Sequence, residues 1–432
     1  MRSLVLGSLL LVASVVGAWF TLTAFRPRRA PTRAAFIDFL AGWLTGELAL
    51  HHIAWQAAAA ALFGWAGAFE RWPGRVGLAL SVASWCGLLA AYNTARKADV
   101  VVERALAEGL GEGYLASLPA SLRAALAPRF SRRSLLFPLP LFRPGVTRTR
   151  DVVYARHAGI NLRLDVYRPS RAATGCPVLL QVHGGGWVVG RKDQQALPLM
   201  THLAARGWVC VAVNYRLSPH ATFPDMLVDL KRALAWIREH IAEYGGDPAF
   251  VAVTGGSAGG HLASLVALTA DDARYQPGFE SVDTHVEACV SFYGVYDFTD
   301  RHGFSPNRGL ARVLERYVMK AARHEAPEAY DDASPMSRLH PGAPPFFVIH
   351  GDRDTMVPVE EARRFVELFR ERAHARVAYA ELPGAQHAFE VLPSIRTAHV
   401  VLGVERFLTW TYARWLERRM GEPDATAATA EP

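Results

Sequence analysis

The 432-residue sequence predicts an α/β fold, with a mostly parallel central sheet and helices on both of its faces, preceded by N-terminal transmembrane helices. Two observations lead to this prediction. Short β-rich runs alternate with helical patterns over residues 151–418, which is typical of a parallel sheet. Three stretches in the first hundred residues contain no Asp, Glu, Lys or Arg. We therefore expect a membrane region at 1–97, an amphipathic segment at 98–150, an α/β domain at 151–418 and a disordered tail at 419–432.

The three uncharged stretches are residues 3–25, 48–69 and 76–95. Each is long enough for a helix to cross the hydrocarbon core of a bilayer, which takes about 18 to 20 residues. One to three spans are expected, and three is the preferred number. The second stretch is the weakest because His51, His52 and Gln56 would enter the bilayer at a cost in free energy. The alternative for the first stretch is a cleaved signal peptide.

The net charge of +7 comes largely from arginines near these apolar stretches. No basic array carries interleaved aromatic residues, so an anionic membrane is a better partner than nucleic acid. Lys and Arg gather after the first and third stretches, which favours a cytoplasmic α/β domain. Losing one span, or cleaving the first, would reverse that assignment. The four cysteines are widely spaced and indicate neither a disulfide framework nor a zinc site.

Residues 98–150 contain leucines at near-helical spacing, followed by arginines and a proline-rich run. The pattern predicts one or two amphipathic helices and an extended linker. These helices could lie on a bilayer, cover a site as a cap, or pack as a spacer. The segment 298–342, which precedes the run PFFVIHG, is the other expected part of a helical cap.

The first chemical motif is the run GGSAG around Ser257. It follows the β-rich run FVAVT and precedes the helical run HLASLVALTA, so Ser257 is expected in a tight turn between a strand and a helix. Glycines on either side permit the strained backbone of such a turn. In this position Ser257 is the candidate nucleophile, and the helix N-terminus favours negative charge beside it.

The second motif is HGGGW at residues 183–187, after the β-rich run PVLLQV. The consecutive residues Gly184, Gly185 and Gly186 leave backbone N–H groups free to point at a substrate oxygen. With the N–H of Ala258, they would form an oxyanion hole. A phosphate-binding loop is disfavoured because no Gly-Lys-Ser/Thr follows.

The third motif has two parts, HGDRD at 350–354 and GAQHAF at 384–389, each placed just after a β-rich run. An acid followed by a histidine, both after the serine, gives the chain order Ser, Asp, His of hydrolase triads. Asp354 is preferred to Asp352 as the acid, and His387 is the base. Spacing alone leaves the choice between the two aspartates open. This chemistry requires no cofactor and no metal.

These motifs, together with NYRLSP at 214–219 and GDP at 246–248, resemble the hormone-sensitive-lipase-like branch of the α/β-hydrolases, including bacterial and mycobacterial-type esterases. The resemblance covers about residues 150–410. It implies that Ser257 is the nucleophile, His387 the general base and acid, and Asp354 its partner. It also implies that Gly185, Gly186 and Ala258 donate to the oxyanion, while Gly184 shapes the turn. The chain departs from many members at Gly256, where they carry Asp or Glu.

We therefore expect a membrane-bound serine carboxylesterase or lipase that acts on a small-molecule or lipid ester through an acyl-enzyme. Two alternatives stay open. One is an amidase or deacetylase of the same fold, and the other is a catalytically silent lipid-binding module. The sequence does not predict the acyl-chain length or the oligomeric state.

Overall fold

The computed structural model describes the chain apart from residues 29–32, 127–129, 139–144, 271, 305–307 and 422–432. Its centre is an eight-stranded sheet in the order β1-β2-β4-β3-β5-β6-β7-β8. The strands β1 and β2 pair antiparallel, as do β2 and β4, and all other neighbours are parallel. The strand bounds are β1 Val146–His157, β2 Ile160–Pro169, β3 Cys176–Val182, β4 Val209–Val213, β5 Gly246–Gly256, β6 Ala288–Phe292, β7 Phe346–Gly351 and β8 Val377–Leu382.

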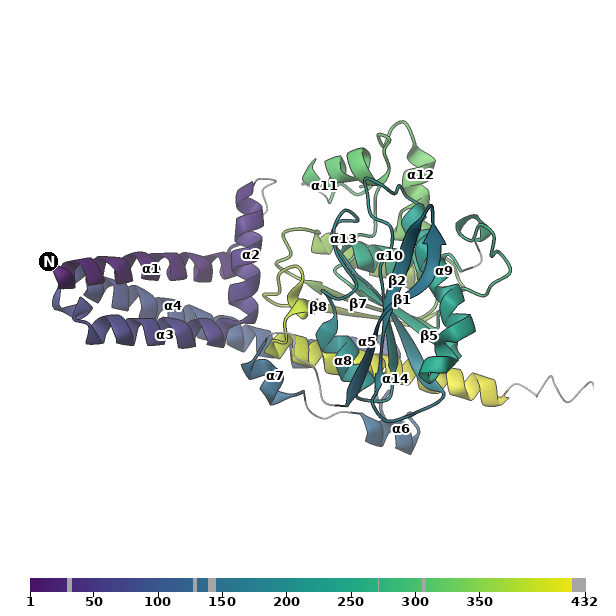
Figure 1. Cartoon of the computed structure of the whole chain (residues 1–432), viewed down its shortest axis with the longest axis horizontal. Helices are drawn as coiled ribbons and strands as arrows, with labels where there is room; N and C mark the ends of the chain where they lie inside the picture. The colour runs from purple at the N-terminus through teal and green to yellow at the C-terminus, as the bar shows by residue number, and fades with distance from the viewer. Residues whose placement is uncertain (29–32, 127–129, 139–144, 271, 305–307, 422–432) are drawn as a thin grey trace, which may run out of the picture.

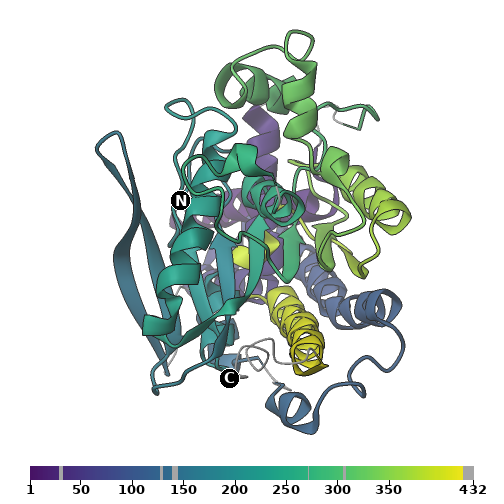
Figure 2. The ribbon, with the colours of Figure 1, turned by 90° about the vertical axis from the view of Figure 1, so that its right-hand side faces the viewer.

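Helices cover both faces of this sheet, as the alternating pattern predicts (Figures 1 and 2). The apolar residues of β4 and β6 are buried throughout, as expected of strands that are covered on both sides. One core lies beneath α9 Asp225–His240, α10 Ala258–Leu268 and α13 Val359–Arg372. The other lies beneath α5 Ala98–Leu110, α8 Leu197–Ala204 and α14 Ile395–Gly421.

The segment 98–150 begins with α5, whose Val102 and Leu106 are fully buried in the second core. Gly109 lies so close to the backbone of β8 that a Cβ atom there would be 2.6 Å from Val377 O. The helix α5 is thus packed against the sheet of the α/β domain. Of the three alternatives for residues 98–150, this helix matches the packed spacer. The short helices α6 Ala120–Ala125 and α7 Arg132–Leu136 follow it, and β1 starts five residues before the expected boundary at 151.

The segment between β6 and β7 contains α11 Arg308–Val313 and α12 Pro327–Asp332, which lie at the top of the domain in Figure 1. At the other end of the chain, α14 runs to Gly421, so the first residues of the expected tail are helical. The rest of that tail, 422–432, lies outside the described residues.

The N-terminal region forms α1 Arg2–Phe25, α2 Arg33–Glu47, α3 Ala49–Trp65 and α4 Trp72–Arg96. In Figure 1, α1, α3 and α4 run side by side, and α2 crosses the end of this bundle next to the α/β domain. Among the described residues, two helical stretches are long and apolar enough to cross a membrane by length and composition, Arg2–Phe25 and Trp72–Leu110, the second of which joins α4 and α5. The helix α3, with 17 residues, is shorter.

Helices α1 and α4 pack closely through small residues. A Cβ atom on Gly7 would lie 2.9 Å from Gly74 N, and one on Gly77 would lie 3.0 Å from Leu11 N. Hydroxyl pairs join the same helices, Ser14 with Ser81 at 2.9 Å and Thr21 with Ser84 at 2.8 Å. Such small and hydroxyl residues are typical of helix contacts in membranes. Since the contacting residues advance together along both helices, α1 and α4 run parallel. The helix α3, which precedes α4 in the chain, runs in the opposite direction on the other side of α4 (Figure 1).

Candidate active site

The carboxyl ends of β3, β5, β6, β7 and β8 share one edge of the sheet, because these strands are parallel neighbours. Ser257 follows β5 directly and precedes α10. Its backbone has φ +59° and ψ −124°, a strained conformation for a residue with a side chain. Its N–H donates to Phe292 O at 3.0 Å, and the residue is partly exposed. This is the sharp strand-to-helix turn that the sequence predicts, and it presents the hydroxyl at the edge of the sheet.

The glycine loop after β3 lies against this turn. A Cβ atom on Gly184 would be 3.2 Å from Ser257 Cβ and 2.5 Å from Gly256 O, so the close approach requires glycine. The Gly184 N–H donates to Gln195 Oε1 at 2.6 Å. Gly185 and Gly186 have φ of +116° and +60°, which turns the chain beside the serine. Ala258 is fully buried at the first turn of α10.

The structure also brings together the predicted acid and base. Asp354 Oδ2 lies 2.7 Å from His387 Nδ1. Asp354 Oδ1 accepts from Met356 N at 2.8 Å and from Val357 N at 2.9 Å. Asp352 instead accepts from Gly384 N at 2.7 Å. The geometry therefore pairs Asp354 with the histidine and gives Asp352 a role in the loop, which spacing alone could not decide.

His350 and His387 both lower the pKa of Asp354. Burial raises the pKa of this carboxyl, but the charge of His387 and the hydrogen bonds from His350 and His387 outweigh burial and hold the pKa far below its usual range. His350 is fully buried, and its Nε2 lies 3.3 Å from Asp354 Oδ2. The carboxylate is therefore ionised near neutral pH, as a partner for a histidine base must be.

Tyr293, which follows β6, connects the serine turn to the histidine. Its ring centroid lies 4.4 Å from that of His387, and a Cβ atom on Gly256 would lie 2.7 Å from its hydroxyl. The hydroxyl donates to the carboxylate of Glu390, and both residues are buried. Gly256 is thus necessary in this chain, because the tyrosine fills the space that a longer side chain would need.

His261, four residues after the serine, has both ring nitrogens engaged. Trp187 Nε1 donates to its Nδ1 at 3.2 Å, and its Nε2 is 2.7 Å from Ala333 O. Phe298 stacks on the same ring, with centroids 4.3 Å apart. Burial lowers the pKa of His261 to about 3. This histidine is therefore a neutral packing residue and not a second base.

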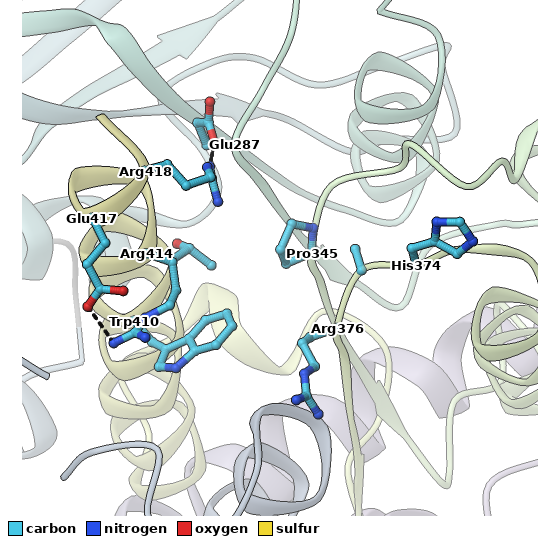
Figure 3. A pocket seen from close by; sticks show the side chains of 10 residues that line it. Glu287, Pro345, His374, Arg376, Trp410, Arg414, Glu417 and Arg418 are labelled. Carbon is cyan, nitrogen blue, oxygen red and sulfur yellow. Dashed lines mark hydrogen bonds and ion pairs between the residues drawn. The ribbon is translucent and has the colours of Figure 1, made fainter. Parts of the chain in front are cut away.

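A cavity of about 380 Å³ lies elsewhere in the domain (Figure 3). Its lining includes Pro345 and Arg376, which directly precede β7 and β8, so it opens at the opposite edge of the sheet from Ser257. Two of its arginines are paired with lining carboxylates, Arg418 with Glu287 at 2.6 Å and Arg414 with Glu417 at 2.8 Å. The cavity contains none of the predicted catalytic residues.

Comparison with known proteins supports the same chemistry. Probable carboxylic ester hydrolase LipM of Mycobacterium tuberculosis is 44% identical over 406 residues, 93% of each chain. The chain belongs to the carboxylic ester hydrolases. Esterase LipQ of the same organism is 40% identical to this esterase over 405 residues, 92% of this chain and 89% of LipQ. Residues 164–369 match the BD-FAE family model.

A solved esterase structure is also similar to this chain. Thermogutta terrifontis esterase 2 phosphonylated by sarin is 26% identical to this esterase, with a TM-score of 0.50, covering 66% of this chain and 99% of that chain. The sheet and these relatives together confirm the α/β-hydrolase fold and the resemblance to the hormone-sensitive-lipase-like branch. The protein is an enzyme that hydrolyses carboxylic esters.

Proposed function

We propose that this esterase hydrolyses its substrate through Ser257, His387 and Asp354, by an acyl-enzyme mechanism. The observation that carries the proposal is the 2.7 Å pair of Asp354 and His387, joined through Tyr293 to the strained serine turn. With Asp354 accepting from Nδ1–H, the Nε2 atom of His387 is left free to take a proton.

In the first step, Ser257 Oγ attacks the ester carbonyl carbon while its proton passes to His387 Nε2. The tetrahedral intermediate collapses, the C–O bond to the alcohol breaks, and His387 returns the proton to the leaving alkoxide. Water then attacks the acyl-enzyme by the same path, giving the carboxylic acid and free serine. Asp354 stays ionised and stabilises the imidazolium that forms in both halves.

We assign the oxyanion donors to the backbone N–H groups of Gly185, Gly186 and Ala258. Gly184 is set apart because its N–H already donates to Gln195. Its role is to bring the loop against Ser257, where any Cβ atom would collide with Gly256 O. Each well-placed oxyanion donor stabilises the transition state by about 2.7 to 4 kcal/mol.

We further propose that the enzyme is membrane-bound and acts on lipophilic esters. The support is the N-terminal bundle, whose α1 and α4 are long and apolar and expose much of their apolar surface. Because α1 and α4 are parallel, a chain that crosses with both must cross back through α3, whose length is about 26 Å. Three crossings place the α/β domain opposite the N-terminus, and the Lys and Arg residues at the domain end favour the cytoplasm.

The test is hydrolysis of p-nitrophenyl esters from acetyl to palmitoyl by wild type and Ser257→Ala in detergent. We expect the substitution to abolish turnover of every ester, and the wild-type rate to rise toward longer acyl chains. Equal turnover by both proteins would refute the serine mechanism. A preference for acetyl over all longer chains would refute the lipophilic substrate.

A further inference from the structure

The N-terminal region contacts the catalytic histidine directly. Phe39 of α2 meets the His387 ring edge to face, with centroids 6.2 Å apart and planes at 68°. Tyr293 contacts the same imidazole from the α/β domain. Phe39 is 9% exposed although it lies on a surface helix. Two aromatic rings from distant parts of the chain therefore restrict the rotation of the catalytic imidazole.

The same helix, α2, also binds the backbone of Ala388, the residue after His387. Trp43 Nε1 donates to Ala388 O at 2.8 Å, and the Trp43 ring stacks on Phe39 with planes at 9°. Ala388 has φ +62°, in the left-handed region that a residue with a Cβ atom rarely adopts. The indole of α2 thus stabilises a strained backbone conformation that directs the side chain of His387.

A buried ion pair anchors the end of α2. Glu47 pairs with Arg396 and accepts from Ser394 Oγ at 2.6 Å, and all three side chains are buried. Separating a buried ion pair leaves two uncompensated charges, so this pair strongly favours the observed position of α2. The two partners of Glu47 lie at the start of α14, where Ser394 directly precedes the helix and Arg396 is its second residue.

The loop of the catalytic acid is tied to the bundle as well. Arg353, next to Asp354, donates to Ala24 O at 3.1 Å and also to Phe25 O at the end of α1. Its guanidinium lies over the Phe25 ring, 5.6 Å from the centroid. Both loops that carry the acid and the base therefore rest on the N-terminal helices.

We propose that α2 is part of the catalytic centre and that Phe39 is a positioning residue for His387, with Trp43 holding the loop. The inference rests on the proposed role of His387 as the base. Phe39 touches the imidazole and acts through it. Its contact restricts the imidazole while Nδ1 lies 2.7 Å from Asp354 Oδ2, and a displacement of about 1 Å in such geometry can cost as much as a hundredfold in rate. The N-terminal region is therefore needed for turnover as well as for attachment.

The experiment measures kcat and KM for p-nitrophenyl butyrate with the full-length chain in detergent. Rates are expressed per active serine, titrated with a fluorophosphonate, so that unfolded protein does not count. For Phe39→Ala we expect kcat to fall about tenfold or more with KM changed less than twofold. Phe39→Leu, which keeps apolar bulk against the ring, should recover most of kcat. Trp43→Phe keeps the stacking and loses the N–H, and should lower kcat about threefold.

The matched control is Ile37→Ala, since Ile37 lies on α2 and is 52% exposed, whereas the ring of Phe36 contacts that of Phe39. It should leave kcat per active serine unchanged. The inference is overturned if Phe39→Ala turns over within twofold of wild type, or if both alanine variants lose the same activity. If Phe39→Ala yields no folded protein, Trp43→Phe decides: a kcat about threefold lower supports the inference, and an unchanged kcat overturns it. Full activity of Ser257→Ala would instead show that the proposed function itself is wrong.

Discussion

Replacing Asp354 with Asn tests the triad through the hydrogen bonds of that side chain. Oδ1 accepts from the N–H groups of Met356 and Val357, so an amide at this position must keep its oxygen there. The NH₂ group then takes the place of Oδ2, 2.7 Å from His387 Nδ1. Two donors cannot face each other, so the imidazole must shift its proton to Nε2. In that tautomer Nε2 can no longer accept the proton of Ser257.

The expected result for Asp354→Asn is a fall in kcat of roughly 10⁴-fold, about 5.4 kcal/mol at 1.36 kcal/mol per tenfold, with little change in KM. The assay is p-nitrophenyl butyrate hydrolysis near neutral pH, with the melting temperature as a check on folding. Asp352→Asn is the matched control, because Asp352 accepts from Gly384 N, whereas the carboxylate on His387 Nδ1 is that of Asp354. A kcat for Asp354→Asn within tenfold of wild type would refute the assignment of the acid.

Three further predictions concern stability. In Gly256→Asp the new Cβ atom would lie 2.7 Å from the Tyr293 hydroxyl. The substitution should therefore lower the unfolding free energy by roughly 1 to 3 kcal/mol and the melting temperature by several degrees. An unchanged melting temperature would contradict this packing. Burial lowers the pKa of His261 to about 3. The unfolded chain therefore binds a proton at this histidine below pH 6.5, while the folded protein does not. The unfolding free energy is unaffected above pH 6.5 and falls by up to about 1.4 kcal/mol per pH unit as pH drops toward 3. Melting curves of His261→Gln should show a weaker loss in acid than wild type. Glu361 is buried on α13, where it accepts from Tyr296 N at 3.0 Å. Burial raises its pKa to about 8, so the unfolding free energy falls as pH rises from 4.5 through 8, and Glu361→Gln should make melting temperature depend less on pH over that range.

The parts of the site that the sequence predicts are those set by local chain geometry. A strand, a glycine turn and a helix follow one another around Ser257, so the order of these elements along the chain is enough to locate the nucleophile. The oxyanion loop and the acid loop likewise follow β-rich runs directly. The parallel sheet then brings these loops to one edge, because all the strands that carry them point the same way.

Contacts between distant segments could not be predicted. Phe39 and His387 are far apart in the sequence, and the interval from Arg33 to Glu47 contains Asp38 and ends on an acid, so it matches no uncharged span. Tyr293 carries no motif, and its role depends on the space left free by Gly256. For residues 98–110, amphipathic periodicity predicts a helix but does not distinguish a cap from a layer on the sheet, since both bury one apolar face.

The measurement that tests the central claim most directly is mapping the covalent adduct of a fluorophosphonate on the full-length enzyme by peptide mass spectrometry. The triad predicts one adduct per chain, on Ser257, with esterase activity lost in proportion to its occupancy. An adduct on another residue with Ser257 unmodified, or full activity with Ser257 fully modified, would contradict it.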